Sequence, residues 1–183
     1  MRMLSRLTPL PLLPILVVGA LTGCGPDKDE FAPPCPRPSL VRGLEDVTLF
    51  KSDGGKDLTD MVVQGRVVGL GGECRFITKG KVPVEASVSV AAEFLRGPAM
   101  QGRQTTVSLF IAVTEGGDVL DKQILQFPVE FPPNVDRVAL TSQPVHMVLP
   151  TTPTKSPAAF GIVAGFQLTP AELETNKQRR GGR

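Results

Sequence analysis

The sequence predicts an all-β fold, an antiparallel β-sandwich of the immunoglobulin-like type with one short C-terminal helix. Short segments of alternating apolar and polar residues recur from Ser39 onward, and Gly- and Pro-rich turns separate them. Helical signals occur only near the C-terminus. Eight or so short strands of this kind favour a sandwich, and a small closed β-barrel is the alternative.

The first part of the predicted domain contains several strands of unequal clarity. Apolar residues in 40–49 form a weak opening pattern, and the Asp, Gly and Ser residues of 51–57 are typical of a turn. Segment 61–70 is rich in valine and predicts a strand that ends at the glycines of 69–72. A further short strand is expected over 74–78.

The clearest strand signal covers 82–94. Six apolar residues at the even positions 82–92 alternate with the residues between them, a pattern that predicts a half-buried strand. The segment 95–102 contains Arg96-Gly97-Pro98 and ends this strand.

The next two strands are expected to form a β-hairpin. Segments 105–114 and 119–131 are joined through Gly116-Gly117, and Pro128 places the second strand at a sheet edge or bulge. Segments 137–140 and 144–149 are compatible with one bent strand or two, and 159–168 predicts the last strand.

The C-terminus changes character. Thr169-Pro170-Ala171-Glu172 matches a capping box with proline at the first helical position, which predicts a helix of about two turns through Asn176. The basic segment 177–183 is expected to fray.

The N-terminus has the features of a secretory signal peptide over residues 1–23. Arg2 and Arg6 precede an apolar run at 7–21, and small or apolar residues precede Cys24. A transmembrane helix is the weaker interpretation, because a span needs about 20 apolar residues, and this run of 15 contains three prolines.

The segment Leu21-Thr22-Gly23-Cys24 resembles the lipobox of bacterial lipoproteins. The resemblance implies that Cys24 becomes the acylated N-terminus, carrying a diacylglyceryl group and in many bacteria a further chain such as palmitate, with an ordinary signal peptide as the alternative. Gly25 rather than Asp follows the cysteine, which implies outer-membrane sorting in a Gram-negative host. The Pro-rich residues 24–38 then predict an extended tether, and 39–176 one domain.

Composition excludes several function classes. Removal of residues 1–23 leaves 160 residues with 18 basic and 18 acidic side chains, so no strong field attracts nucleic acid. Trp and Tyr are absent, which disfavours a carbohydrate-binding cleft.

Two cysteines remain when Cys24 is acylated. Export would place Cys35 and Cys74 in an oxidising compartment, where a disulfide between them is expected and two free thiols are the alternative. Such a bond closes a loop of about 40 residues and would contribute roughly 4 kcal/mol in the chain-entropy model.

The sequence contains no catalytic signature. His146 is the only histidine, so any Ser-His-Asp arrangement must use it, and no Gly-x-Ser-x-Gly segment occurs. Glu85 and Glu93 lie about 26 Å apart along a strand and are expected on a solvated face. We therefore predict no enzyme, no cofactor and no metal. Arg96 is a candidate partner contact because it precedes a rigid Gly-Pro turn.

Three aspartates near a Gly-Gly pair raise calcium as an alternative. Asp53, Asp57 and Asp60 lack the spacing of a calcium loop, and turn or cap roles account for them more simply.

Three short segments carry a family resemblance: 55–60, 96–99 and the Gly-Phe-Gln-Leu-Thr-Pro run that begins at Gly165. With Cys35-Pro36 at the start, the chain resembles a group of uncharacterised proteobacterial lipoproteins over about residues 35–176. The resemblance implies a single periplasmic domain and transfers no functional residue.

We hypothesise that the protein is a non-enzymatic lipoprotein of the bacterial envelope, anchored on the periplasmic side. It would bind another envelope component, and the edge strands of the sandwich are available for strand addition by that partner. The alternatives are a cell-wall or lipid-acting enzyme accessory and a carrier of a small apolar ligand.

Overall fold

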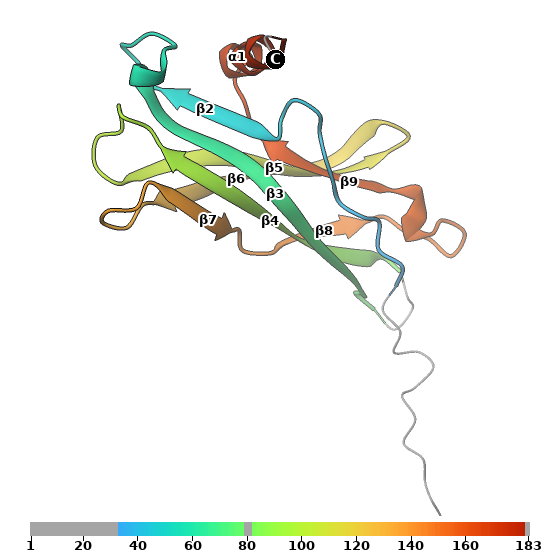
Figure 1. Cartoon of the computed structure of the whole chain (residues 1–183). Helices are drawn as coiled ribbons and strands as arrows, with labels where there is room; N and C mark the ends of the chain where they lie inside the picture. The colour runs from blue at the N-terminus through green and yellow to red at the C-terminus, as the bar shows by residue number, and fades with distance from the viewer. Residues whose placement is uncertain (1–32, 79–81, 182–183) are drawn as a thin grey trace, which may run out of the picture. The chain divides into compact units, whose positions relative to one another are not determined.

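The computed structural model describes residues 33–78 and 82–181, which form two β-sheets and one α-helix (Figure 1). One sheet, here sheet A, has four strands in the order β1-β9-β5-β6. Their bounds are Ser39–Leu40 for β1, Gly161–Phe166 for β9, Gln104–Glu115 for β5 and Asp118–Glu130 for β6.

The other sheet, sheet B, has the order β2-β3-β4-β7, and β8 pairs with β4 as well. Their bounds are Asp46–Phe50 for β2, Met61–Phe76 for β3, Val84–Arg96 for β4, Arg137–Thr141 for β7 and Val145–Leu149 for β8. The helices are two 3₁₀ turns, η1 (Leu58–Asp60) and η2 (Pro157–Ala159), and α1 (Pro170–Gly181).

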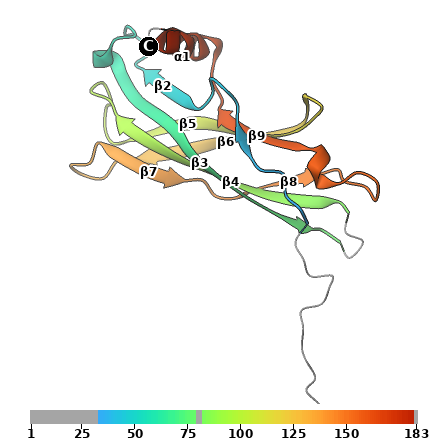
Figure 2. The ribbon, with the colours of Figure 1, turned by 45° about the vertical axis from the view of Figure 1, so that its right-hand side comes forward.

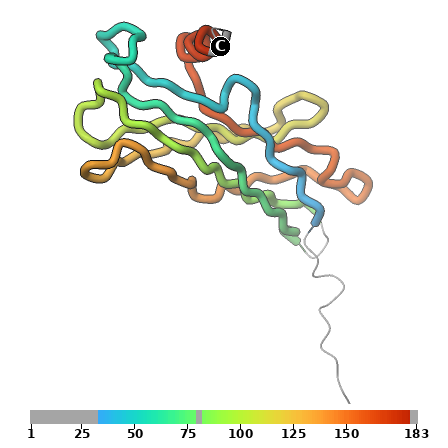
Figure 3. The backbone as a smooth tube through the Cα atoms, in the orientation of Figure 1, coloured from blue at the N-terminus to red at the C-terminus, as the bar shows by residue number. Residues whose placement is uncertain are grey.

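The predicted all-β sandwich with a short C-terminal helix is confirmed. The strand pairs are antiparallel except β1 with β9, which is parallel. Figure 3 shows the chain before β2 running beside β9, so that segment 39–50 contributes a strand first to sheet A and then to sheet B. This segment links the two sheets along one side.

Strand β4 has the alternation that the sequence predicts. Its even-numbered residues from Val84 to Phe94 are buried, and the residues between them are partly exposed. The Phe94 ring lies 5.7 Å from the ring of Phe127 and 6.2 Å from that of Phe166, both of which belong to sheet A. These rings connect the two sheets through the core, where aromatic pairs contribute beyond their buried area.

The prediction of two strands at 61–70 and 74–78 is wrong, because β3 is one strand of 16 residues. The glycines do not turn the chain: Gly69, Gly71 and Gly72 pair with Ala91, Ser89 and Val88 of β4. The irregularity is instead a bulge between Val67 and Gly69. Gly72 also makes room for Pro38, whose Cγ would lie 2.7 Å from a Cβ at that position.

The predicted hairpin and edge position are confirmed. β5 and β6 pair along their length, and Gly116 and Gly117 form the turn that joins them. The φ angles of these glycines, 58° and 101°, suit a tight hairpin turn. β6, with Pro128, is an edge strand of sheet A. Of the two alternatives for 137–149, one bent strand or two strands, the structure has two. These are β7 and β8, which pair with successive parts of β4.

Helix α1 begins with the predicted capping box but ends later than predicted. The backbone N–H of Thr169 donates to Glu172 Oε2 at 2.7 Å, and the N–H of Glu172 donates to Thr169 Oγ1 at 3.3 Å. The helix continues past Asn176 to Gly181. Hydrogen bonds from Asn176 and Arg179 to β2 hold these later turns, as described below. Figure 2 shows α1 lying beside β2.

Candidate interaction site

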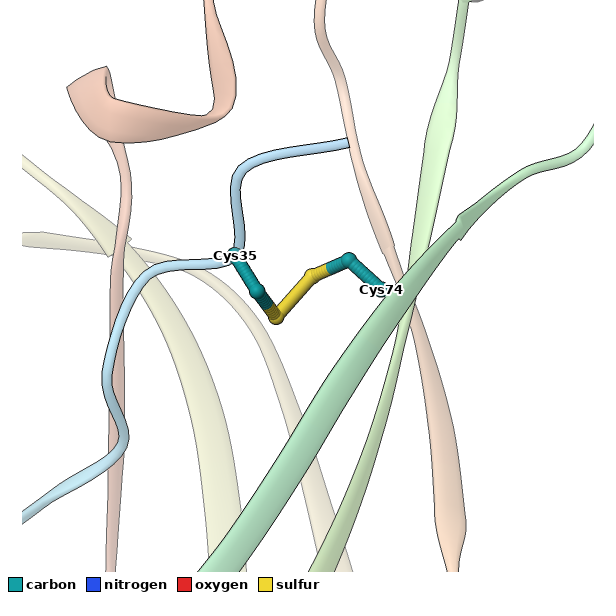
Figure 4. The surroundings of a disulfide bond; sticks show 2 residues. All are labelled: Cys35 and Cys74. Carbon is teal, nitrogen blue, oxygen red and sulfur yellow. A yellow bond between two sulfur atoms is a disulfide. The ribbon is translucent and has the colours of Figure 1, made fainter. Parts of the chain in front are cut away.

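Cys35 and Cys74 form the predicted disulfide (Figure 4). The Cα atoms lie 5.3 Å apart, and Cys74 is buried at the end of β3 that is farther from η1. Pro33 is buried too, and Cys35 packs against the core. The bond therefore fixes the point at which the N-terminal segment joins the sandwich. Cys24, the predicted acylation site, lies outside the described residues.

Arg96 lies at the end of β4, where it stabilises the loop that follows. Its Nη2 donates to the carbonyl oxygens of Met100 at 3.2 Å and Gly102 at 3.1 Å, and its Nη1 lies 3.8 Å from Asp136 Oδ1. The side chain is 28% exposed. These contacts give Arg96 a structural role inside its own loop, and its role as a partner contact stays a prediction.

The register brings together a charged cluster that the sequence does not reveal. Arg75 of β3 pairs with Glu85 of β4, and its Nη2 lies 2.6 Å from Glu85 Oε1. His146 of β8 places its Nδ1 3.2 Å from the same oxygen. The hydrogen bond from Arg75 holds the pKa of the Glu85 carboxyl below its ordinary value, and His146 acts in the same direction.

A serine lies next to this cluster, because Ser87 is the cross-strand partner of His146. Within the described residues, no hydrogen bond joins Ser87 to the imidazole, and Glu85 is already bonded to Arg75. A catalytic carboxylate would instead orient a histidine that activates the serine. The arrangement is that of an ion-pair network on an outer sheet face.

Of the three aspartates near Gly54-Gly55, Asp60 stabilises the turn through its side chain. Asp60 Oδ1 lies 2.8 Å from Lys51 Nζ, and its Oδ2 accepts a hydrogen bond from the Gly55 N–H at 2.9 Å. The hydrogen bond from Lys51 lowers the pKa of Asp60. Among the described residues, no group of three or more His, Cys, Asp or Glu side chains is arranged to hold a metal ion.

Strand β6 offers the longest exposed strand edge in the described part of the chain. It has 13 residues, and it is the last strand of sheet A. Three of its aliphatic side chains, Val119, Leu120 and Ile124, are between 46% and 60% exposed. Exposed aliphatic residues concentrated on one edge strand mark a surface suited to association with another chain.

The inner face of β6 belongs to the core, and this fixes the orientation of the strand. Phe127 and Val129 are buried, and Leu125 packs against the core. Gln123 Nε2 donates to the carbonyl oxygen of His146 in β8 at 3.1 Å, which links the edges of the two sheets. Ile124 lies on the opposite face of the strand, beside its cross-strand neighbour Phe110.

The usable part of this edge is limited at both ends. The register with β5 shifts at Val113/Thr114, where Val113 pairs with Asp121 and Thr114 with Val119, so that Leu120 forms a bulge. Pro128 lacks a backbone N–H at the other end. Between them, 121–127 is a regular stretch of strand.

A cavity of about 290 Å³ lies between α1 and the strands β2 and β3. Asn176 Nδ2 donates to the carbonyl oxygen of Asp46 at 2.7 Å, and Arg179 Nη1 donates to Thr48 Oγ1 at 2.6 Å. These polar side chains both line the cavity and attach the helix to the sheet.

The fold and this edge define a class of protein: an all-β, disulfide-linked sandwich with one long exposed edge strand. No helix among the described residues has the length and apolar character of a membrane span. Comparison with known proteins finds no matching family model, no matching curated protein and no matching solved structure.

Proposed function

We propose that this protein is a non-enzymatic, membrane-anchored lipoprotein of the bacterial cell envelope that binds another envelope protein along strand β6. The lipobox-like segment ending at Cys24 supports the anchor, and Gly25 supports an outer-membrane address. The Cys35–Cys74 disulfide supports an oxidising compartment such as the periplasm. The resemblance to uncharacterised proteobacterial lipoproteins agrees with this address.

The observation that carries the binding role is the exposed edge of β6. An edge strand presents unpaired backbone N–H and C=O groups, and an extended partner segment can satisfy them by adding one strand to the sheet. The regular stretch 121–127 accommodates about seven residues of such a partner, if each pairs with one residue of β6.

The side chains of this stretch define the partner's chemistry. We expect an apolar residue of the added strand to pack against Ile124 on the same face, because cross-strand neighbours lie about 5 Å apart. Asp121 and Lys122 are exposed at the beginning of the stretch, so charges of opposite sign at the facing positions would set the register. The partner is thus a short extended segment with an apolar centre and charged residues at one end.

The binding site can be tested by photo-crosslinking in living cells. A benzophenone amino acid at Ile124 should crosslink to one envelope protein, whereas the same probe at Val68 should not. Val68 is a matched control, since it is an exposed aliphatic residue of similar exposure on β3 of the other sheet. Equal adducts at both positions, or none at Ile124, would contradict the proposed site.

A pair of substitutions gives the same comparison without a probe. Ile124→Asp should abolish co-purification of the partner that the probe identifies, because it places a charge opposite the apolar centre of the added strand. Val68→Asp should leave co-purification unchanged. Both variants should fold normally, since substitutions at exposed positions usually change stability by no more than about 0.5 kcal/mol.

The anchor has its own test. Cys24→Ser should prevent acylation and release the protein from the membrane fraction. Membrane association and normal maturation of this variant would rule out the lipid anchor, independently of the result for β6.

A further inference from the structure

Two exposed aliphatic residues lie at the end of sheet B where the N-terminal segment joins the domain. Ile77 directly follows β3 and is 45% exposed, and Val148 of β8 is 48% exposed. The register places them at the same end of the sheet: Arg75, Glu85 and Val148 form one row across three strands, and the Ile77 N–H donates to the Pro83 carbonyl two residues farther out. We call this end of the domain, which includes the exposed residues Pro34, Ile77, Val148 and Pro153, the tether end.

The tether end also contains a small apolar-walled cavity of about 230 Å³. Pro33, Phe76, Val82 and Pro157 are among its lining residues. The hydroxyl of Thr151, which lines it too, accepts a hydrogen bond from the Val84 N–H at 3.1 Å. Much of the surface around the cavity is therefore apolar.

Several polar side chains in the described part of this end have partners. Arg75 and His146 both contact Glu85, and Lys155 is paired with Glu115 and lies 5.1 Å from the centre of the Phe160 ring. Paired charges reduce the attraction to anionic lipid and also the cost of approaching a membrane interface.

The length of the chain before the domain limits the position of this surface. Nine residue steps separate Cys24 from Pro33, which correspond to about 30 Å when fully extended. Pro33 is buried and Cys35 is bonded to Cys74, so the point at which the chain joins the domain cannot lie farther than this from an acylated Cys24. The other end of β3 is about 50 Å away along the 16-residue strand.

We propose that the tether end contacts the phospholipid surface, with Ile77 and Val148 at the level of the lipid headgroups. This inference rests on the proposed lipid anchor and adds the orientation of the domain. Short tethering raises the effective concentration of the apolar surface at the membrane, so a contact too weak to hold a free protein can persist. The opposite end, with η1 and α1, then points away from the bilayer.

The chain offers a direct test because it contains neither Trp nor Tyr, so one introduced Trp is the only strong emitter. We would purify the mature acylated protein as single-Trp variants at Ile77 and Val148 and place it on phosphatidylcholine vesicles with brominated acyl chains. Emission from both positions should fall by about half or more, since interfacial groups lie about 5–10 Å deep, within reach of bromine.

Two matched variants provide the controls. Leu58→Trp lies at the other end of β3, and Val68→Trp lies on the same outer face of sheet B as Val148, away from the tether end; both positions are exposed aliphatics like the reporters. Neither should be quenched. The use of vesicles of neutral phosphatidylcholine alone tests the apolar contact without attraction to anionic lipid.

The outcomes separate this inference from the proposed anchor. Vesicle-bound protein with no quenching at either reporter, or with equal quenching at all four positions, would overturn the orientation and leave the anchor intact. Protein that does not bind the vesicles at all would remove the anchor and the orientation with it. If Ile77→Trp does not fold, the quenching of Val148→Trp compared with that of Val68→Trp decides whether the tether end contacts the lipid.

Discussion

At one end of β3, Cys74 is bonded covalently to Cys35, whereas beside the other end α1 is held to β2 by hydrogen bonds from Asn176 and Arg179. Cys74 belongs to the hydrophobic core, and Cys35 packs against it. Of the helix residues with described side chains, 170–179, none belongs to that core. The tether end thus combines a covalent bond with apolar packing, and the helix end depends on polar contacts.

This difference predicts unequal local stability. Segments with few buried apolar contacts open locally at lower free energy than the core strands. The helix end should therefore open first, while the tether end should open only with the whole domain. A rigid attachment point suits a domain held by its N-terminal segment, because the proposed tether would pull on that end.

The largest expected effect comes from removing the disulfide. The variant Cys35→Ala/Cys74→Ala should lose about 4 kcal/mol of unfolding free energy, because a bond between residues 39 positions apart restricts the unfolded chain. Guanidinium unfolding measures this loss. Reductant should destabilise the wild type equally and the variant not at all; a loss below about 1 kcal/mol would mean that the tether end does not depend on its covalent bond.

A smaller effect is expected at the helix end. Asn176→Ala removes the buried hydrogen bond to the Asp46 carbonyl and should cost about 1–2 kcal/mol. Amide hydrogen exchange should accelerate in α1 and remain unchanged in β4. Lys177→Ala, an exposed neighbour, is the control and should change little. Faster exchange throughout the sandwich would show that the two ends are not independent.

The smallest effect concerns the ion-pair network at the tether end. The pKa of Glu85 is lowered in the folded protein from its ordinary value of 4.5, so the carboxylate stabilises the fold above that pH. This contribution disappears as the pH falls through the lowered pKa. Glu85→Gln should therefore destabilise by up to about 1 kcal/mol near neutral pH and have almost no effect once the pH lies below the lowered pKa.

A double-mutant cycle assigns the cause of this pH dependence. In an Arg75→Ala background, Glu85→Gln should cost less at neutral pH, because the hydrogen bond that lowers the pKa is already missing. If Glu85→Gln costs as much stability in the Arg75→Ala background as in the wild type, the pH dependence is due to His146 instead.

Some features of the fold follow from local sequence and were predictable. The alternation in β4 gives both the strand and its buried face, since successive side chains point to opposite sides. Gly116-Gly117 specifies the hairpin, and Thr169 with Glu172 specifies the start of α1. Each of these signals depends on residues close together in the chain.

Other features depend on contacts between distant segments. The glycines of β3 suggest a turn, yet pairing with β4 keeps the strand extended through them. Helix α1 continues beyond its predicted end because Asn176 and Arg179 bond to β2. Glu85 and His146 are 61 positions apart in the sequence and meet because β4 pairs with β8 in one particular register.

The candidate interaction site shows the same division. Pro128 alone indicated that β6 lies at an edge or bulge, because proline cannot donate to a neighbouring strand. Other features are known only from the assembled sheets. These are the exposure of Ile124, the bulge at Leu120 and the position of Ile77 and Val148 at the same end of sheet B. By itself, the sequence determined strand character, inward faces and helix capping, because these depend on neighbouring residues. Only the tertiary structure decided which strands pair, where the sheets end and which apolar side chains stay exposed, because these depend on register and packing between distant parts of the chain.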